Sequence, residues 1–230
     1  MKIYRLPAKI RALCFDMDLT LYSHPEYGRL QIDSIVARLA VIRGLSFDEM
    51  NHEVEGLRKD WMQSHGGKSP SLSHILPAYG ISMEENIRWR EELYEPEKFI
   101  KEDKRLGETL RELSRSYILG VLTNNSLGVA ERTLSLLGVG EYFPIVIGLD
   151  TCMCPKPHEK LLLKFSQFSA CPLETCVSIG DRYDIDLDLP LEMGMGAILV
   201  DGVEDVYKLP ETLGHPRTST RPQAPALEPH

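Results

Sequence analysis

The sequence predicts an α/β protein with a doubly wound parallel sheet and an inserted helical domain. Unbroken apolar runs alternate with helical patterns, as expected for strands that are buried on both faces of a parallel sheet. Several of these runs end abruptly in Asp, Thr or Asn, which is typical of sheets that bind a ligand at the carboxyl ends of their strands. After the first strand, the chain from 23 to 102 carries helical signals and almost no strand signal. An insert of that length predicts a second, smaller domain rather than a loop.

The alternation of strands and helices can be followed along the chain. The first strand is the apolar run from Ile10 to Phe15, which stops at Asp16. Further strands are predicted over 117–122, 143–149, 176–179 and 197–200, with helices over 106–113, 127–137 and 161–168 between them. This pattern places the α/β core in two pieces, residues 1–22 and 103–213.

The insert, residues 23–102, is predicted to be a helical cap. Its helices are expected over 30–42, 46–64, 71–79 and 82–94, and Ser46 with Glu49 forms a capping box at the start of the second. Trp61 and Trp89 are expected to pack between these helices. The tail, 214–230, has four prolines and few apolar residues, so disorder is predicted there.

Composition limits the class of partner. The chain has 230 residues, a formal net charge of -8 and a sequence pI near 5.4, with no run of Lys or Arg. These values argue against a nucleic-acid polymer or an anionic membrane as the main partner. The five cysteines lack a disulfide or zinc spacing, and no signal peptide or membrane span is recognisable, so a cytoplasmic location is expected. Nothing in the sequence indicates an oligomeric state.

Polar side chains follow four of the predicted strands and should meet at one rim of the sheet. Each has an ordinary explanation alone, such as a helix cap or a solvated loop residue. Their joint appearance at strand ends is better explained by a shared site. The residues are Asp16 and Asp18 after the first strand, Thr123 and Asn124 after the second, Lys156 after the third, and Asp181 and Asp186 after the fourth.

This set suits phosphoryl transfer through an aspartyl intermediate. A phosphomonoester dianion repels an anionic nucleophile, so a carboxylate can attack only if a cation neutralises the charge. Mg²⁺ is held by one or two carboxylates together with waters and substrate oxygens. Asp16 and Asp181 are the candidate carboxylate ligands of the metal, and the backbone carbonyl of Asp18 is a further candidate ligand. Asp16 would also be the nucleophile.

The remaining residues fit supporting roles. Asp18 can protonate the leaving alkoxide and then deprotonate the hydrolytic water. Thr123 and Asn124 would donate hydrogen bonds to the phosphoryl oxygens, while Lys156 would neutralise both Asp16 and the phosphoryl group. Asp186 is expected to orient Lys156 or metal-bound water rather than to bind the metal directly.

These residues resemble, in order, the four motifs of the haloacid dehalogenase-like hydrolase superfamily. The motifs are Asp16-Met17-Asp18-Leu19-Thr20, then Thr123-Asn124, then Lys156, then Gly180-Asp181 with Asp186. The resemblance implies a Rossmann-like core, a helical cap inserted after the first motif, and Mg²⁺-dependent phosphatase activity with the roles above. Thr20-Leu21-Tyr22 is similar to the branch that contains pyrimidine 5'-nucleotidase-like and small phosphosugar phosphatases. The expected substrate is a small phosphorylated metabolite: a nucleotide, a sugar phosphate or a phosphoglycolate-like ester.

Other functions stay open at this point. A phosphomutase would use the same residues. A haloacid dehalogenase is disfavoured because a leaving halide needs no proton from Asp18. A phospho-receiver module would have no use for the large insert, and a silent phospho-ligand binding protein could dispense with Asp16 or Asp18. Five polar residues of the cap and its hinge could contact substrate, although ordinary surface polarity explains each one singly: Tyr22, Tyr27, Arg58, His65 and Arg90.

Overall fold

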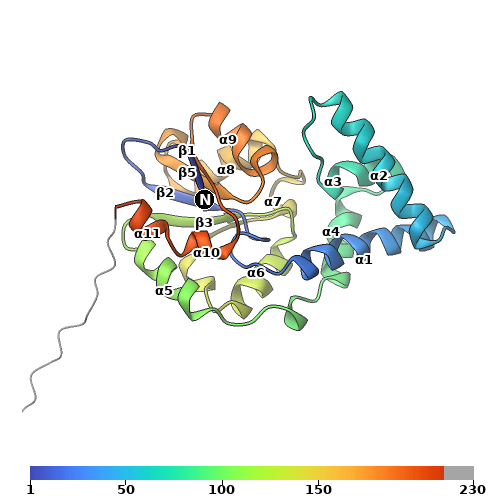
Figure 1. Ribbon diagram of the computed structural model, residues 1–230, viewed down its shortest axis with the longest axis horizontal. Coiled ribbons are helices and arrows are strands. Elements are labelled where there is room, and N and C mark those ends of the chain that lie inside the picture. Colours follow the sequence, from blue (N-terminus) through green and yellow to red (C-terminus); the bar gives the residue numbers. More distant parts are fainter. Residues whose placement is uncertain (215–230) are drawn as a thin grey trace, which may run out of the picture.

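The computed structural model describes residues 1–214, and within them six strands form one sheet (Figure 1). The strand order is β1-β6-β5-β2-β3-β4, in which β1 pairs antiparallel with β6 and all other neighbours are parallel. The predicted doubly wound fold is therefore confirmed. The strands are β1 (Lys2–Arg5), β2 (Ala12–Phe15), β3 (Ile118–Leu122), β4 (Ile145–Ile147), β5 (Cys176–Gly180) and β6 (Gly196–Leu199).

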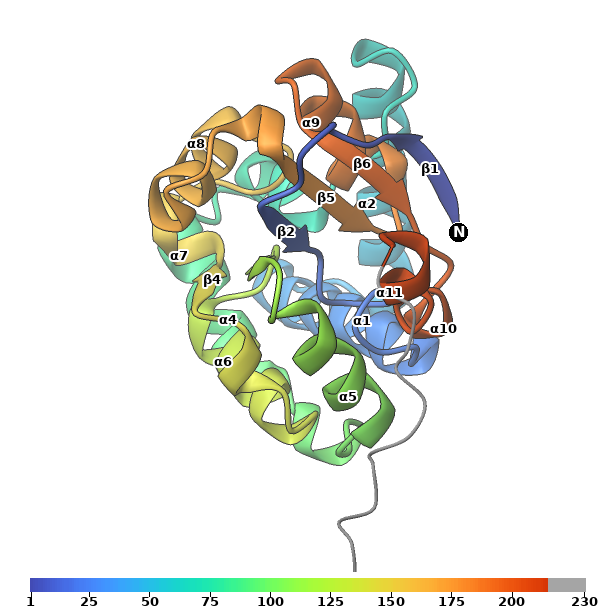
Figure 2. The ribbon, with the colours of Figure 1, turned by 90° about the vertical axis from the view of Figure 1, so that its left-hand side faces the viewer.

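The central strand β2 is buried on both faces. Leu13 and Phe15 pack in one apolar cluster, whereas Ala12 and Cys14 pack in another on the opposite face. Helices cover both faces of the sheet, with α5 and α6 on one side and α8 and α9 on the other (Figure 2). The core helices are α5 (Lys104–Leu113), α6 (Leu127–Leu136), α7 (Leu149–Cys152), α8 (Glu159–Ser169), α9 (Asp188–Glu192), α10 (Val203–Val206) and α11 (Leu209–Thr212).

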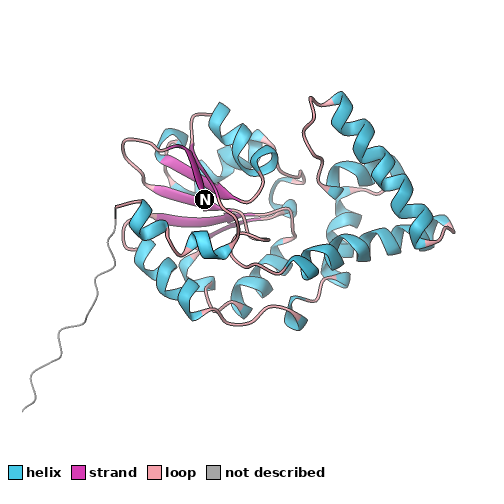
Figure 3. Ribbon diagram, in the orientation of Figure 1, coloured by secondary structure: helices cyan, strands magenta, loops and turns pink. Residues whose placement is uncertain are grey.

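The first four of the five α-helices between β2 and β3 lie to one side of the sheet and form the segment that we call the cap (Figure 3). They are α1 (Pro25–Arg43), α2 (Phe47–Ser64), α3 (Leu72–Ile75) and α4 (Met83–Leu93). The cap has its own apolar cluster, in which Trp89 is 1% exposed and Trp61 packs from the edge, in agreement with the packing predicted for both. The boundaries of the cap at 22/23 and 102/103 stay a prediction. The predicted disordered tail lies outside the described residues, apart from Gly214.

The structure departs from the predicted elements in several places. The short helices α7, α9, α10 and α11 were not predicted. Strand β1 was not predicted, because all four of its side chains are exposed at the sheet edge and give no alternating pattern. The strand expected over 143–149 shortens to β4. The helix expected over 71–79 divides into α3 and a 3-10 turn over Leu76–Tyr79, where Pro77 interrupts the α-helical hydrogen bonds. Among residues 1–214, no helix combines the length and hydrophobicity needed to cross a membrane.

Candidate active site

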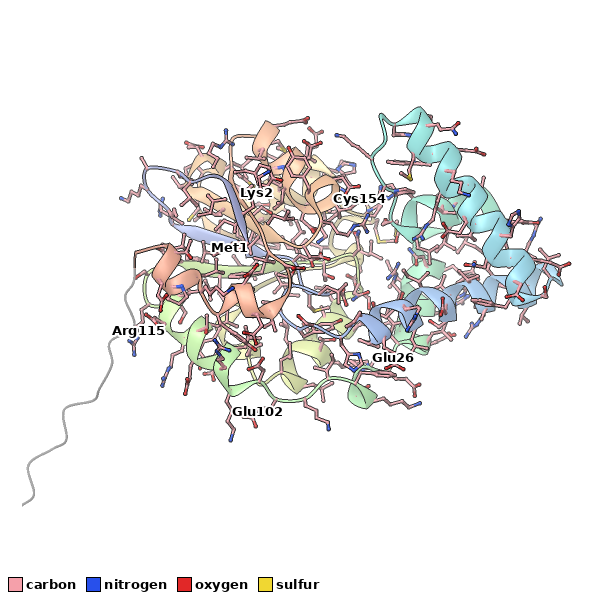
Figure 4. All side chains as sticks on the ribbon, in the orientation of Figure 1. Met1, Lys2, Glu26, Glu102, Arg115 and Cys154 are labelled. Carbon is pink, nitrogen blue, oxygen red and sulfur yellow. The ribbon has the colours of Figure 1, made fainter. Side chains whose placement is uncertain are left out.

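The polar residues predicted at the strand ends come together at the carboxyl end of the central strands. Asp16 follows β2, Thr123 follows β3 and Asp181 follows β5, and these three strands are neighbours in the sheet. Lys156 reaches them from the loop after α7. In Figure 4, Cys154, two residues before this lysine, lies at the end of the core nearest the cap.

Lys156 is buried between two carboxylates. Its Nζ lies 2.5 Å from Oδ1 of Asp16 and 2.8 Å from Oδ1 of Asp186, and only 4% of the lysine is exposed. Burial opposes the lysine charge, but the two carboxylates outweigh it and hold the pKa of Lys156 above its ordinary value. The other Asp16 oxygen accepts a hydrogen bond of 3.1 Å from the Thr20 hydroxyl. Lys156 thus contacts both Asp16 and Asp186.

Three carboxylates lie close enough together to hold a cation. Oxygen atoms of Asp16, Asp181 and Asp186 all lie within 4.8 Å of one another. Burial, together with the charges of Asp16 and Asp186, raises the pKa of Asp181 to about 7, and burial raises that of Asp186 to about 6. These raised pKa values mean that the three carboxylates do not readily all carry a charge at once. A hard divalent cation bound between them would favour their charged form, so the cluster fits such a cation. Asp186 can pack directly against the backbone at position 180 because that residue is glycine. A Cβ on Gly180 would come within 2.4 Å of the Asp186 Cβ.

The carboxylate of Asp18 makes a separate set of contacts. Its Oδ1 accepts hydrogen bonds from the Tyr22 hydroxyl and, at 3.2 Å, from the Gln31 amide, and its Oδ2 accepts one of 2.8 Å from the Asn125 amide. Burial and the Asp18 charge raise the pKa of Tyr22, so the hydroxyl stays protonated and donates. Leu19, with φ 59°, turns the chain through the left-handed region directly after Asp18. Asp18 is therefore held by both the core and α1 of the cap.

Asn125 connects this carboxylate to α4 and was not assigned a role from the sequence. Its Oδ1 accepts a 3.1 Å hydrogen bond from Nη1 of Arg90, which leaves its amide nitrogen to face Asp18. Because a guanidinium can only donate, this contact fixes the orientation of the amide. The position of Asn125 after a strand end was the one available signal, but its partner on α4 is 35 residues away in the sequence.

Thr123 and Asn124 make local contacts that shape the rim. Thr123 is 2% exposed, and its hydroxyl accepts a hydrogen bond from the backbone N–H of Asn125. The Oδ1 of Asn124 accepts a 2.6 Å hydrogen bond from the backbone N–H of Lys156, and its amide donates to the Lys156 carbonyl at 3.4 Å. Asn124 thus joins the end of β3 to the lysine loop.

A cleft of about 480 Å³ separates these residues from the cap. Of the five polar residues singled out in the cap and its hinge, Arg58 and Arg90 line this cleft. Tyr22 instead bonds to Asp18, Tyr27 stacks on Phe99, and His65 stacks on Trp61. The core side of the cleft is lined by Asp16, Asp18, Asn124, Asn125, Lys156, Asp181, Arg182, Ile185 and Asp186.

Comparisons with known proteins agree with this architecture. The protein-family model described as haloacid dehalogenase-like hydrolase matches residues 13–200. A phosphoglycolate phosphatase of Pectobacterium atrosepticum is 24% identical over 84% of this chain and 100% of its own length. A pyrophosphatase, PpaX, of Listeria monocytogenes is 29% identical over 90% of this chain and 89% of its own. The crystal structure of a HAD phosphatase from Thermococcus onnurineus superposes with a TM-score of 0.60 at 20% identity, covering 91% of this chain and 100% of that one.

Proposed function

Because the chain belongs to the haloacid dehalogenase-like hydrolase family, we propose that it is a Mg²⁺-dependent phosphatase that hydrolyses a small phosphomonoester through an aspartyl-phosphate. The observation that carries this proposal is the presence of two differently held carboxylates two residues apart. Asp16 is buried against Lys156, whereas Asp18 faces Asn125 and the cap. The names of the relatives, phosphoglycolate phosphatase and pyrophosphatase, support a small phosphorylated substrate. A cytoplasmic location stays a prediction.

In the first step, a carboxylate oxygen of Asp16 attacks phosphorus, and the bond from phosphorus to the ester oxygen breaks. Asp18 gives its proton to the departing alkoxide, which leaves as the alcohol. In the second step, Asp18 takes a proton from water as that water attacks phosphorus. Asp16 is then released as a carboxylate, together with inorganic phosphate.

The buried cation Lys156 offsets the charge of both Asp16 and the phosphoryl oxygens throughout. Mg²⁺, when bound by Asp16, Asp181 and the Asp18 carbonyl, would supply further neutralisation of the same charge. Asp186 holds Lys156 and lies close enough to Asp181 to join the cation site. In this proposal Asn124 fixes the lysine loop, and Thr123 and Asn124 present donors to the phosphoryl group.

The test is phosphate release from a panel of phosphomonoesters, measured with Mg²⁺ and with a chelator. The panel comprises nucleoside monophosphates, sugar phosphates, 2-phosphoglycolate and p-nitrophenyl phosphate. We expect metal-dependent release that Asp16→Asn reduces by at least about a thousandfold, as for other lost nucleophiles.

The Asp16→Asn variant should stay folded, because burial raises the pKa of Asp16 and the neutral amide removes that cost. Circular dichroism and thermal unfolding check this point. Wild-type turnover in Asp16→Asn would exclude Asp16 as the nucleophile. Absence of release from every ester would instead favour a phosphomutase or a binding protein.

A further inference from the structure

The guanidinium of Arg90 is a buried charge on the cap side of the cleft. The residue is 6% exposed and lines the cleft. Its four hydrogen bonds go to neutral acceptors: the side-chain oxygens of Asn86, Tyr94, Asn125 and Ser73, at 3.0 to 3.2 Å. One of its five N–H donors has no hydrogen bond among the described residues.

No carboxylate within residues 1–214 forms an ion pair with Arg90. Burying a charge without a counter-ion costs free energy, so a sequence rarely keeps one without a use for it. The acidic residues on the cap side of the cleft are Asp33 and Glu55, and Glu55 is already paired with Arg58 at 3.0 Å. Among the described residues on the cap side of the cleft, Arg90 is therefore a buried cation that no carboxylate pairs with and that an anion in the cleft could contact.

The position of Arg90 relates it to the leaving group. Asp18, which protonates the leaving oxygen in the proposed reaction, is two hydrogen bonds away through Asn125. A short leaving group bound beside Asp18 would thus carry its next polar atoms towards Arg90. A guanidinium in this position suits a carboxylate or a second phosphate on the leaving group, because it makes strong charge-assisted hydrogen bonds to either.

We propose that Arg90 forms an anion subsite in the cap, so that the preferred substrate is a short phosphomonoester with a second anionic group. This inference rests on the proposed phosphatase function and adds the class of its substrate. Arg90 contacts the part of the substrate that leaves, whereas Lys156 contacts the part that is transferred.

The experiment compares kcat/KM for substrates that differ only at the far end. These are 2-phosphoglycolate with a carboxylate, ethylene glycol bisphosphate with a second phosphate, and 2-hydroxyethyl phosphate with a neutral hydroxyl. We expect the wild type to prefer at least one of the two anionic substrates over the neutral one by about tenfold or more. The better of the two identifies the anion.

The ratio of these kcat/KM values is then measured in Arg90→Gln, Arg90→Lys and Arg88→Gln. This ratio, kcat/KM for an anionic substrate divided by that for the neutral one, does not depend on how much of a variant is folded. A loss of activity that is equal on all substrates, such as one caused by a displaced Asn125, also cancels in it. We expect it to fall towards one in Arg90→Gln and to be partly kept in Arg90→Lys. It should be unchanged in Arg88→Gln, since Arg88 lies on the same helix with 63% of its side chain exposed.

Two results would overturn the inference. One is a wild type that shows no preference between anionic and neutral substrates. The other is an Arg90→Gln variant that loses activity equally on all of them, which would make Arg90 a positioning residue for Asn125 alone. Failure to release phosphate from any substrate, including p-nitrophenyl phosphate, would instead reject the phosphatase function itself.

Discussion

At the scale of single residues, Lys156 is the charge on which the site depends most. It is the shared cation of Asp16 and Asp186, and all three side chains are at least nine-tenths buried. Removing one partner of a buried ion pair leaves an uncompensated charge, which costs more than the pair itself contributes. The lysine therefore stabilises the fold as well as the proposed chemistry.

Lys156→Met should lower the free energy of unfolding by about 3 to 5 kcal/mol in the absence of metal, because two buried carboxylates lose their cation. Urea unfolding monitored by circular dichroism measures this loss. The double variant Lys156→Met/Asp186→Asn should recover part of it, since one of the stranded carboxylates is then neutral. Equal stability of Lys156→Met and wild type would contradict this account.

Some contacts of the single residues in this site could be predicted from the sequence, and others could not. Asp16, Asp181 and Lys156 were predicted to meet because parallel strands end at one edge of the sheet, and the structure brings them together. The contacts of Asp18 could not be predicted in this way. They depend on the left-handed turn at Leu19 and on an amide whose orientation is set by Arg90 of the cap.

At the scale of elements, local signals identified the long helices well. The capping box predicted at the start of α2 is present, with the Ser46 amide donating to Glu49 at 2.9 Å and the Ser46 hydroxyl accepting from the Glu49 amide. Edge strand β1 was missed because its exposed side chains carry no pattern, and its pairing with β6 links opposite ends of the chain. Short elements defined by distant partners are the ones that local patterns cannot predict.

Glu49→Ala should lower the midpoint of thermal unfolding at neutral pH by about 2 °C, since a capping contact is lost. The hydrogen bonds from Ser46 hold the pKa of Glu49 below its ordinary value. The contact therefore stabilises the folded state above the pKa of an unfolded Glu and is lost as the pH falls through the lowered folded value.

The difference in midpoint between wild type and Glu49→Ala should accordingly narrow in acid. Differential scanning calorimetry at neutral and acid pH measures it. Glu53→Ala removes a glutamate at an exposed position of the same helix outside the capping box, and this matched control should leave the midpoint at neutral pH close to that of the wild type. If the difference in unfolding midpoint between wild type and Glu49→Ala stays constant down to acid pH, the Glu49 charge does not have this role.

At the scale of the whole molecule, the cation site joins segments that are far apart in the sequence. Asp16 comes from the first piece of the core, whereas Asp181 and Asp186 come from the second, with the cap between the two pieces. A cation bound there would interact with the folded chain and not with the unfolded one. Binding of that kind raises the stability of the complete fold.

Mg²⁺ should raise the thermal unfolding midpoint of the wild type, and a chelator should reverse the shift. When the free Mg²⁺ concentration is a hundred times the dissociation constant, the free energy of unfolding should rise by about 2.7 kcal/mol. Asp181→Asn should abolish the response, whereas Asp184→Asn, outside the carboxylate group, should retain it. The prediction fails if Asp181→Asn responds to Mg²⁺ as the wild type does.

The strand order has a consequence for how the protein is made. Strand β2 lies between β3 and β5, which follow it in the sequence by more than a hundred residues. During synthesis, the segment that bears Asp16 leaves the ribosome long before either neighbour exists, while the cap can form its helical contacts at once. Asp16, the proposed nucleophile, therefore gains its surroundings only after translation has passed β5, so that a truncated chain carries this aspartate without Lys156, Asp181 and Asp186 around it.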